Sequence, residues 1–239
     1  MGKSFRIIVP GGLNTDIVGL GVERIIGEGE LTLGGNLKIG PGEKARNMAQ
    51  MCGAMLGEGE VAMIGRTVCD PFGLWKIPVE ALDRSGVNTD NVIVQEFDPD
   101  YPRYPGIAMI PVDKEGNNQI YVLPGINSDF SPDDVFSVRH LFQDAGKPLV
   151  IVALEIPAAT VLMAIELSHI NGLKVLLDPG GIDSRMAEII KPALNHVFLI
   201  KPNEHEAEIL TGIRVKDFVS ASKAANILLR NGVKYVLIT

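Results

Sequence analysis

The chain has 239 residues, 46% of them hydrophobic, so it can bury a full core and predicts one domain or one domain with a smaller appendage. Its formal net charge of −7 argues against a general nucleic-acid binder, and its longest apolar runs are too short to cross a membrane. Because the N-terminus carries no secretory signal and the two cysteines, Cys52 and Cys69, form no CxxC motif, we expect a cytoplasmic protein without a disulfide scaffold.

A buried strand is predicted at the start of the chain, over residues 5–10. The segment Gly11-Gly12-Leu13-Asn14-Thr15-Asp16 follows it as a loop, so Asn14 and Asp16 lie where this strand ends. These two side chains are candidates for ligand binding. They are also ordinary turn formers that bond their own backbone, and the residues alone leave both interpretations open.

The next predicted elements are a short β segment, residues 31–39, and a helix, residues 44–56. The helix begins after Gly40-Pro41-Gly42, and its expected apolar face is Ala45, Met48, Ala49, Met51, Cys52 and Met55. Gly42, Lys44 and Asn47 fall at its start, where a sugar or phosphate oxygen could meet a cation and N–H donors. A glycine-initiated helix with a solvated lysine is the alternative.

After a strand at residues 61–65 and a helix ending near residue 86, the pattern changes. Residues 107–112 and 119–123 predict a hairpin with a polar turn. We expect the segments at about 17–40 and 91–124 to form a small β lid over one edge of a domain that spans residues 1–239. An ordinary edge hairpin is the alternative interpretation.

From residue 149 onward, apolar runs alternate regularly with helical patterns. The expected strands are residues 149–154, 173–177, 196–200 and 235–239, and the expected helices are 157–170, 184–191 and 219–230. Continuous apolar strands between helices predict an α/β fold, in which a mainly parallel sheet is covered by helices on both faces.

Polar residues follow several of these strands, and a parallel sheet gathers the carboxyl ends of its strands at one edge. We therefore expect these residues to converge: Glu155, Asp178, Asn203, Glu206 and Thr239. Three of them are carboxylates, which together with phosphate oxygens and water suit Mg²⁺. Asn203 and Glu206 also have the spacing of a helix capping box, which needs no ligand.

Six segments in this order resemble the PfkB carbohydrate kinase family, with its ribokinase-like fold. The segments are Gly12-Leu13-Asn14-Thr15-Asp16, the helix start at Gly42, Lys44 and Asn47, Asp70-Pro71-Phe72-Gly73, Pro124-Gly125-Ile126-Asn127, Leu154-Glu155-Ile156-Pro157, and Lys201-Pro202-Asn203-Glu204-His205-Glu206-Ala207-Glu208. The resemblance implies ATP-dependent phosphorylation of the hydroxymethyl group of a sugar, with a β lid that closes on the substrate and often forms a homodimer.

The resemblance also implies a role for each matching residue. The sugar would be held by Asn14, Asp16, Gly42, Lys44, Asn47 and Glu155. Asn203 and Glu206 match the NxxE motif that organises Mg²⁺ and the ATP phosphates, and Lys201 and Thr239 fall near the nucleotide. Glu206 and Asp178 are the expected metal ligands, and participation of a monovalent cation stays open.

Two departures from the family pattern qualify these roles. The family pairs glycines around the lysine, whereas Gly42-Glu43-Lys44-Ala45-Arg46 has one, and Arg46 with Arg103 adds cations that would suit a phosphorylated sugar. The family's Gly-Ala-Gly-Asp motif, whose aspartate is the catalytic base, is absent, so we expect this aspartate beyond Thr239. A nucleoside kinase of the same fold and a non-catalytic sugar-binding protein remain the alternatives.

Overall fold

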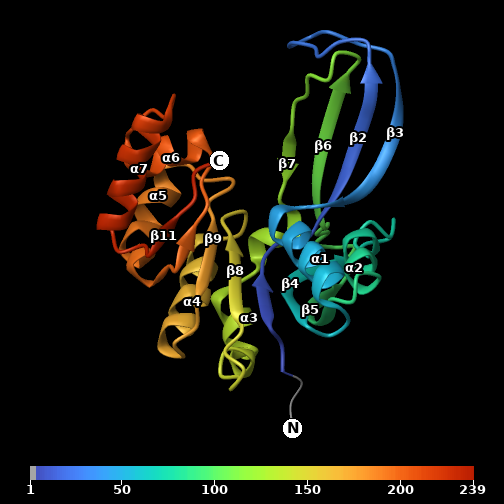
Figure 1. Ribbon diagram of the computed structural model, residues 1–239. Helices are drawn as coiled ribbons and strands as arrows, with labels where there is room; N and C mark the ends of the chain where they lie inside the picture. The colour runs from blue at the N-terminus through green and yellow to red at the C-terminus, as the bar shows by residue number, and fades with distance from the viewer. Residues whose placement is uncertain (1–3) are drawn as a thin grey trace.

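The main body of the protein is built on a parallel sheet. The computed structural model describes residues 4–239, within which this sheet has seven strands in the order β11-β10-β9-β8-β1-β4-β5, all parallel. Its strands are β1 (Ile7–Pro10), β4 (Val61–Cys69), β5 (Asn88–Glu96), β8 (Leu149–Ala153), β9 (Val175–Asp178), β10 (Leu199–Ile200) and β11 (Tyr235–Val236). The predicted α/β architecture is confirmed (Figure 1).

Helices cover both faces of the main sheet (Figure 1). The α-helices are α1 (Lys44–Leu56), α2 (Lys76–Asp83), α3 (Pro132–Ser137), α4 (Ala158–Ile170), α5 (Ser184–Ile190), α6 (Glu204–Thr211) and α7 (Phe218–Arg230). Short 3-10 helices are η1 (Gly125–Asp129), η2 (Arg139–Leu141) and η3 (Lys191–His196). Among residues 4–239, every helix is too short or too polar to span a bilayer.

Two hydrophobic cores lie on opposite faces of the sheet. Successive side chains of a strand point to opposite faces, and neighbours in β1 separate accordingly. Ile8 belongs to the cluster that contains Ile165 of α4, whereas Val9 belongs to the cluster that contains Ala45 and Ala49 of α1. The small side chains of α1 let this helix approach the sheet closely, which places its first turn at the carboxyl end of β1.

A second, smaller sheet projects from the main body, and we call it the lid sheet (Figure 1). Within the described residues its order is β3-β2-β6-β7. The strands are β2 (Asn14–Val22), β3 (Gly34–Gly42), β6 (Gly106–Asp113) and β7 (Tyr121–Leu123). The outer pairs are antiparallel and the central pair is parallel. Because β1 continues into β2 and β3 leads into α1, the lid sheet is joined directly to the carboxyl edge of the main sheet.

The structure corrects two expectations. Residues 91–96, which we expected in the lid, belong to β5 at the edge of the main sheet, paired in parallel with β4. Because an edge strand is partly exposed, its apolar and polar residues alternate along the sequence in the same way as those of a lid strand. On α1, Met51 and Met55 are 64% and 78% exposed, because the helical repeat carries them away from the face that holds Ala45 and Ala49.

Candidate active site

Lys44 is the residue around which the candidate site is assembled. It begins α1, and its backbone N–H donates to Glu155 Oε2 over 3.0 Å. Its Nζ lies 3.3 Å from Glu206 Oε1 and 3.9 Å from Asp178 Oδ1. Since Glu155 follows β8, Asp178 ends β9 and Glu206 lies in α6, one lysine joins three carboxylates from separate elements, as the parallel topology predicts.

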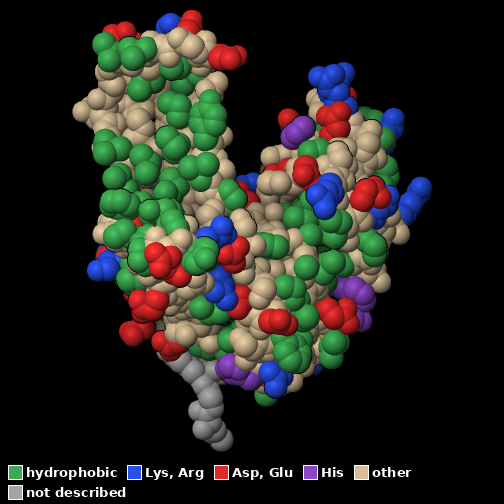
Figure 2. Space-filling model, turned by 180° about the vertical axis from the view of Figure 1, so that it is seen from behind, with side chains coloured by type: hydrophobic (Ala, Val, Ile, Leu, Met, Phe, Trp, Pro, Cys, Tyr) green, Lys and Arg blue, Asp and Glu red, His purple; other side chains and the backbone are tan. Residues whose placement is uncertain are grey.

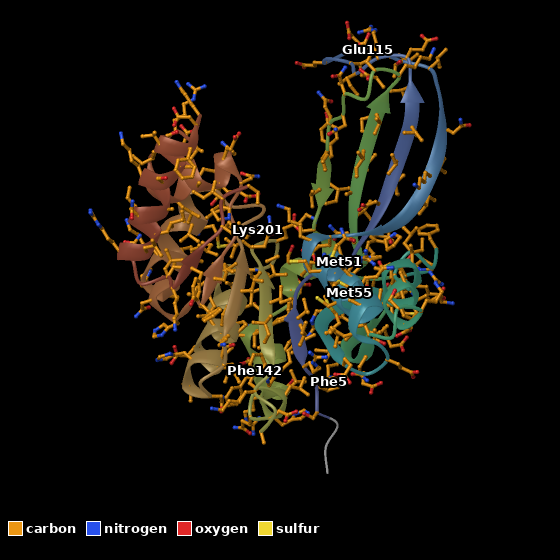
Figure 3. The ribbon with its side chains drawn as sticks, in the orientation of Figure 1. Phe5, Met51, Met55, Glu115, Phe142 and Lys201 are labelled. Carbon is orange, nitrogen blue, oxygen red and sulfur yellow. The ribbon has the colours of Figure 1, made fainter. Side chains whose placement is uncertain are left out.

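A pocket of about 280 Å³ opens beside this lysine. Its lining residues are Lys44, Asn47, Met48, Asp178, Lys201, Asn203 and Glu206. Lys201 Nζ lies 3.6 Å from Asp178 Oδ2, so two ammonium groups and two carboxylates face the pocket. In Figure 3, Lys201 lies at the end of the main sheet nearest the lid sheet, whereas Phe5 and Phe142 lie at the opposite end.

Gly180 leaves room for the Lys44 side chain because it has no side chain of its own. A Cβ atom at this position would lie 1.7 Å from Lys44 Nζ, so any side chain would displace the ammonium group. The backbone N–H of Gly180 donates to Asp178 Oδ1 over 2.9 Å, which orients that carboxylate. The turn after β9 therefore fixes both members of the Lys44–Asp178 pair.

The capping box predicted at the start of α6 is present. Asn203 Oδ1 accepts from the Glu206 N–H over 2.8 Å, and Glu206 Oε2 accepts from the Asn203 N–H over 2.9 Å. This reciprocal pair satisfies two N–H groups at the helix start. It also leaves Glu206 Oε1 directed at Lys44, so the cap and the charged cluster use different oxygens of one buried carboxylate.

Asn14 and Asp16 lie at the start of β2, on the lid side of the site. Asn14 is buried, and its Oδ1 accepts from Asn127 Nδ2 over 2.8 Å. Burial raises the pKa of Asp16; the charge of Arg46 opposes this shift and that of Glu155 adds to it. A Cβ atom at Gly42 would lie 1.7 Å from Asp16 Oδ1, so glycine alone fits beside this carboxyl group.

The two remaining predicted residues have less central positions. Asn47 is exposed, lines the pocket and accepts a hydrogen bond from the Arg46 guanidinium group. Thr239 is exposed and its N–H donates to the Pro202 carbonyl over 3.1 Å, which places it beside the segment that leads into α6. Its side chain does not line the pocket within the described part of the chain.

Neither extra arginine presents a free cation at this site. Arg46 is buried and its guanidinium group donates to the Gly42 carbonyl, to Gln50 and to Asn47. Arg103 donates to Asp129 over 2.6 Å. Both guanidinium groups are therefore used by the protein itself, which removes the observation that favoured a phosphorylated sugar.

Two residues of the site were not singled out by the sequence. Asn127 bonds both Leu13 and Asn14, from a position more than a hundred residues away in the chain. Glu43 is buried at the start of α1 and its φ angle is 83°. The Pro124-Gly125-Ile126-Asn127 motif does not reveal the contact of Asn127 with Asn14, and the only sequence signal at Glu43 is that it replaces a glycine of the family pattern.

Comparison with known proteins agrees with this architecture. The family model described as pfkB family carbohydrate kinase matches residues 5–239. Ribokinase of Haemophilus influenzae is 33% identical over 235 residues, which cover 98% of this chain and 71% of that protein. Ribokinase of Mus musculus is 32% identical over 237 residues, covering 99% and 69%. The chain thus spans about 70% of the length of these relatives.

Solved structures show the same fold. The structure of Arabidopsis thaliana ribokinase complexed with ribose and ATP matches with a TM-score of 0.77 and 26% identity, covering 98% of this chain and 72% of that one. A structure described as Sa239 matches with a TM-score of 0.83 and 29% identity, covering 99% and 73%. The predicted combination of parallel sheet and lid is confirmed by this likeness.

Proposed function

Because this chain belongs to the pfkB family of carbohydrate kinases, we propose that it serves ATP-dependent phosphoryl transfer to the hydroxymethyl group of a sugar. The observation that supports this most strongly is the position of Lys44. It joins the side of the site formed by the lid and Glu155 to the side formed by Asp178 and Glu206. A sugar and a nucleotide phosphate bound on these two sides would meet at one ammonium group.

On the sugar side, the proposed binding residues are Asn14, Asp16, Gly42, Lys44, Asn47 and Glu155. Carboxylates suit a polyol because they accept hydrogen bonds from its hydroxyl groups, and amides suit it because they both accept and donate. Asp16 and Asn14 belong to β2, so a movement of the lid sheet would carry them onto the ligand together.

On the nucleotide side, the proposed residues are Lys201, Asn203, Glu206 and Thr239. Phosphoryl transfer depends mainly on positioning and on stabilisation of charge, and the ammonium groups of Lys44 and Lys201 supply positive charge at the pocket. The start of α6 adds the positive end of a helix dipole. These contributions bind and orient phosphate, and we assign no described residue as the base that takes the hydroxyl proton.

Asp178 and Glu206 are the proposed Mg²⁺ ligands. Among the described residues, no group of three or more His, Cys, Asp or Glu side chains is arranged to hold a metal ion. Two carboxylates nevertheless fit Mg²⁺ when phosphate oxygens and water complete its coordination, which is its usual arrangement in proteins. When bound, the metal would neutralise charge on the nucleotide phosphates.

The direct test combines binding and turnover. Isothermal titration calorimetry with D-ribose, other pentoses, hexoses and nucleosides identifies the ligand class, and a coupled ADP-release assay with Mg·ATP measures transfer. We expect D-ribose or a related sugar to bind and its affinity to change when Mg·ATP is present. Sugar binding without any dependence on Mg·ATP would instead support a non-catalytic binding protein, and no binding of any sugar would refute the proposal.

We also propose that the lid sheet forms a homodimer through its face opposite Asp16. Ile17 of β2 pairs with Ile39 of β3 and with Met109 of β6, and Met109 pairs with Tyr121 of β7, so these side chains lie on one face of the lid sheet. Leu37 and Leu123 lie on the same face. The exposed fraction of the five residues other than Ile17 is 44% to 68%. Figure 2 shows apolar side chains gathered over the lid sheet and the hollow that separates this sheet from the main body. An apolar sheet face of this kind favours burial against a second copy.

Sedimentation velocity tests the homodimer. Tyr121→Glu should shift the chain toward monomer, because it places a charge on the apolar face of the lid. Met55→Glu is the matched control, since Met55 is a similarly exposed apolar residue on α1. A wild-type chain that sediments as a monomer at high concentration would refute the lid dimer.

A further inference from the structure

Glu43 adopts a backbone conformation that side chains rarely occupy. Its φ and ψ angles are 83° and 139°, in a region that favours glycine. Its side chain is also buried, with the residue only 8% exposed. A glycine would relieve the backbone strain and avoid burying a carboxyl group, so the presence of glutamate points to a role for this side chain.

The hydrogen bonds of Glu43 are incomplete unless the carboxyl group carries a proton. One oxygen, Oε2, accepts from the Arg46 N–H over 3.2 Å. The other, Oε1, is buried and finds no donor among residues 4–239. The neighbouring group that raises the pKa of this carboxyl through hydrogen bonding and charge is Glu155, itself an acid. Two ionised carboxylates have no hydrogen to share, so a proton between them is what satisfies both groups.

The surrounding charges do not force Glu43 to ionise. Burial raises the pKa of the Glu43 carboxyl well above its ordinary value, and hydrogen bonding and charge from Glu155 raise it further. The backbone N–H groups of Arg46 and Ala45 act in the opposite direction and lower this pKa. The Arg46 guanidinium group donates elsewhere. Lys44 Nζ points to Asp178 and Glu206, and Asp16, on the lid strand, adds negative charge near Glu155.

We propose that Glu43 is a protonated positioning residue, whose carboxyl group shares one proton with Glu155 and thereby holds that carboxylate in place for the ligand. This inference rests on the proposed function in that it takes Glu155 to contact the sugar. The Glu155 carboxylate is then held at two points, by the Lys44 N–H on Oε2 and by the proton of Glu43. The pair carries a single negative charge, since two carboxylates in contact do not both ionise readily.

The proton itself can be detected without any ligand. Carboxyl groups with ordinary pKa values are almost fully ionised at about pH 7, so the infrared C=O band of a protonated carboxyl group should report this pair. We expect the band in the wild-type chain and its loss in Glu43→Gln. Asp16→Asn should keep the band, which separates the pair from Asp16, and Glu188→Gln, at an exposed site, is the matched control. Absence of the band in the wild type, or its persistence in Glu43→Gln, would overturn the proposal.

A binding measurement tests the positioning role. Ligand contact excludes water from the Glu43 carboxyl group and favours its protonated state. D-ribose affinity should therefore fall, by on the order of tenfold per unit of pKa change, as pH rises past the raised pKa of Glu43 in the free protein. Glu43→Gln keeps an amide donor toward Glu155 and should bind with no such fall. Glu43→Ala should bind more weakly at every pH.

The infrared and binding measurements distinguish a failure of the proposed shared proton from a failure of the proposed sugar site. If D-ribose fails to bind any variant while the infrared band behaves as expected, the sugar assignment fails and the shared proton stands. If the wild type and Glu43→Gln bind with the same dependence on pH, the positioning role is refuted even though sugar binding is confirmed.

Discussion

Asn127→Ala should remove the link between the main body and the lid. The Asn127 side chain accepts from the Leu13 N–H over 3.1 Å and donates to the Leu13 carbonyl over 3.3 Å and to Asn14 Oδ1 over 2.8 Å. Leu13 and Asn14 mark the passage from β1 to β2. All three bonds are buried, and a Cβ atom at Gly106 would lie 2.3 Å from Asn127 Nδ2, so the amide is held in a closely packed site.

The expected cost follows from these three bonds. A buried hydrogen bond contributes about 1 kcal/mol to the free energy of unfolding, so losing three predicts a loss of about 3 kcal/mol. The substitution also leaves the Leu13 N–H and Asn14 Oδ1 without their partner. Because Asn14 is a proposed sugar-binding residue, D-ribose affinity should fall as well.

Urea denaturation measures this change. The midpoint should fall while the slope with denaturant stays constant, since the variant buries nearly the same surface. Asn118→Ala is the control, because Asn118 is exposed in the turn between β6 and β7. A loss below about 1 kcal/mol for Asn127→Ala would refute the reasoning, because it would mean that the three bonds add little.

Three further predictions concern the start of α1 and α6. Glu206→Gln keeps the capping box but removes the negative charge of a proposed Mg²⁺ ligand, so calorimetry should show Mg·ATP binding weakened about tenfold with D-ribose binding nearly unchanged; equal loss of both would contradict the assigned roles. Arg46→Ala removes one buried and two partly buried side-chain hydrogen bonds and should lower the free energy of unfolding by about 2 kcal/mol in urea, and an unchanged midpoint would count against it. For Glu43, the raised pKa means that the folded state holds the proton more tightly than the unfolded state. Its contribution to stability is complete below the ordinary value of 4.5 and is lost as pH rises through the raised pKa, so thermal unfolding of Glu43→Gln should lack this decline.

The arrangement of the main sheet could be predicted because its signal is local. Continuous apolar runs such as residues 149–153 are typical of strands buried on both faces, and the parallel topology then brings Glu155, Asp178 and Glu206 to one edge. The extents of β10 and β11 could not be predicted in the same way. Their apolar runs continue beyond the residues that pair, because pairing depends on neighbouring strands rather than on propensity.

The contacts within the site depended on information that the sequence does not display. Asn127 bonds Asn14 across more than a hundred residues, and no local pattern pairs them. Glu43 follows Gly42 in a motif where a charged side chain predicts solvent exposure, yet its backbone conformation turns it inward against Glu155. The sequence shows that Glu43 replaces a glycine of the family pattern, but only the folded structure shows that this side chain is buried beside Glu155.

Amide chemical-shift mapping of the labelled chain tests the central claim most directly. Titration with D-ribose should shift the amides at the start of β2, at the start of α1 and around Glu155, and a second titration with Mg·ATP should shift Lys201 and the first turn of α6, with Lys44 responding to both. Shifts that fall on separate, distant surfaces, or a Lys44 amide that responds to neither titration, would contradict the account of a single site at the carboxyl edge of the main sheet.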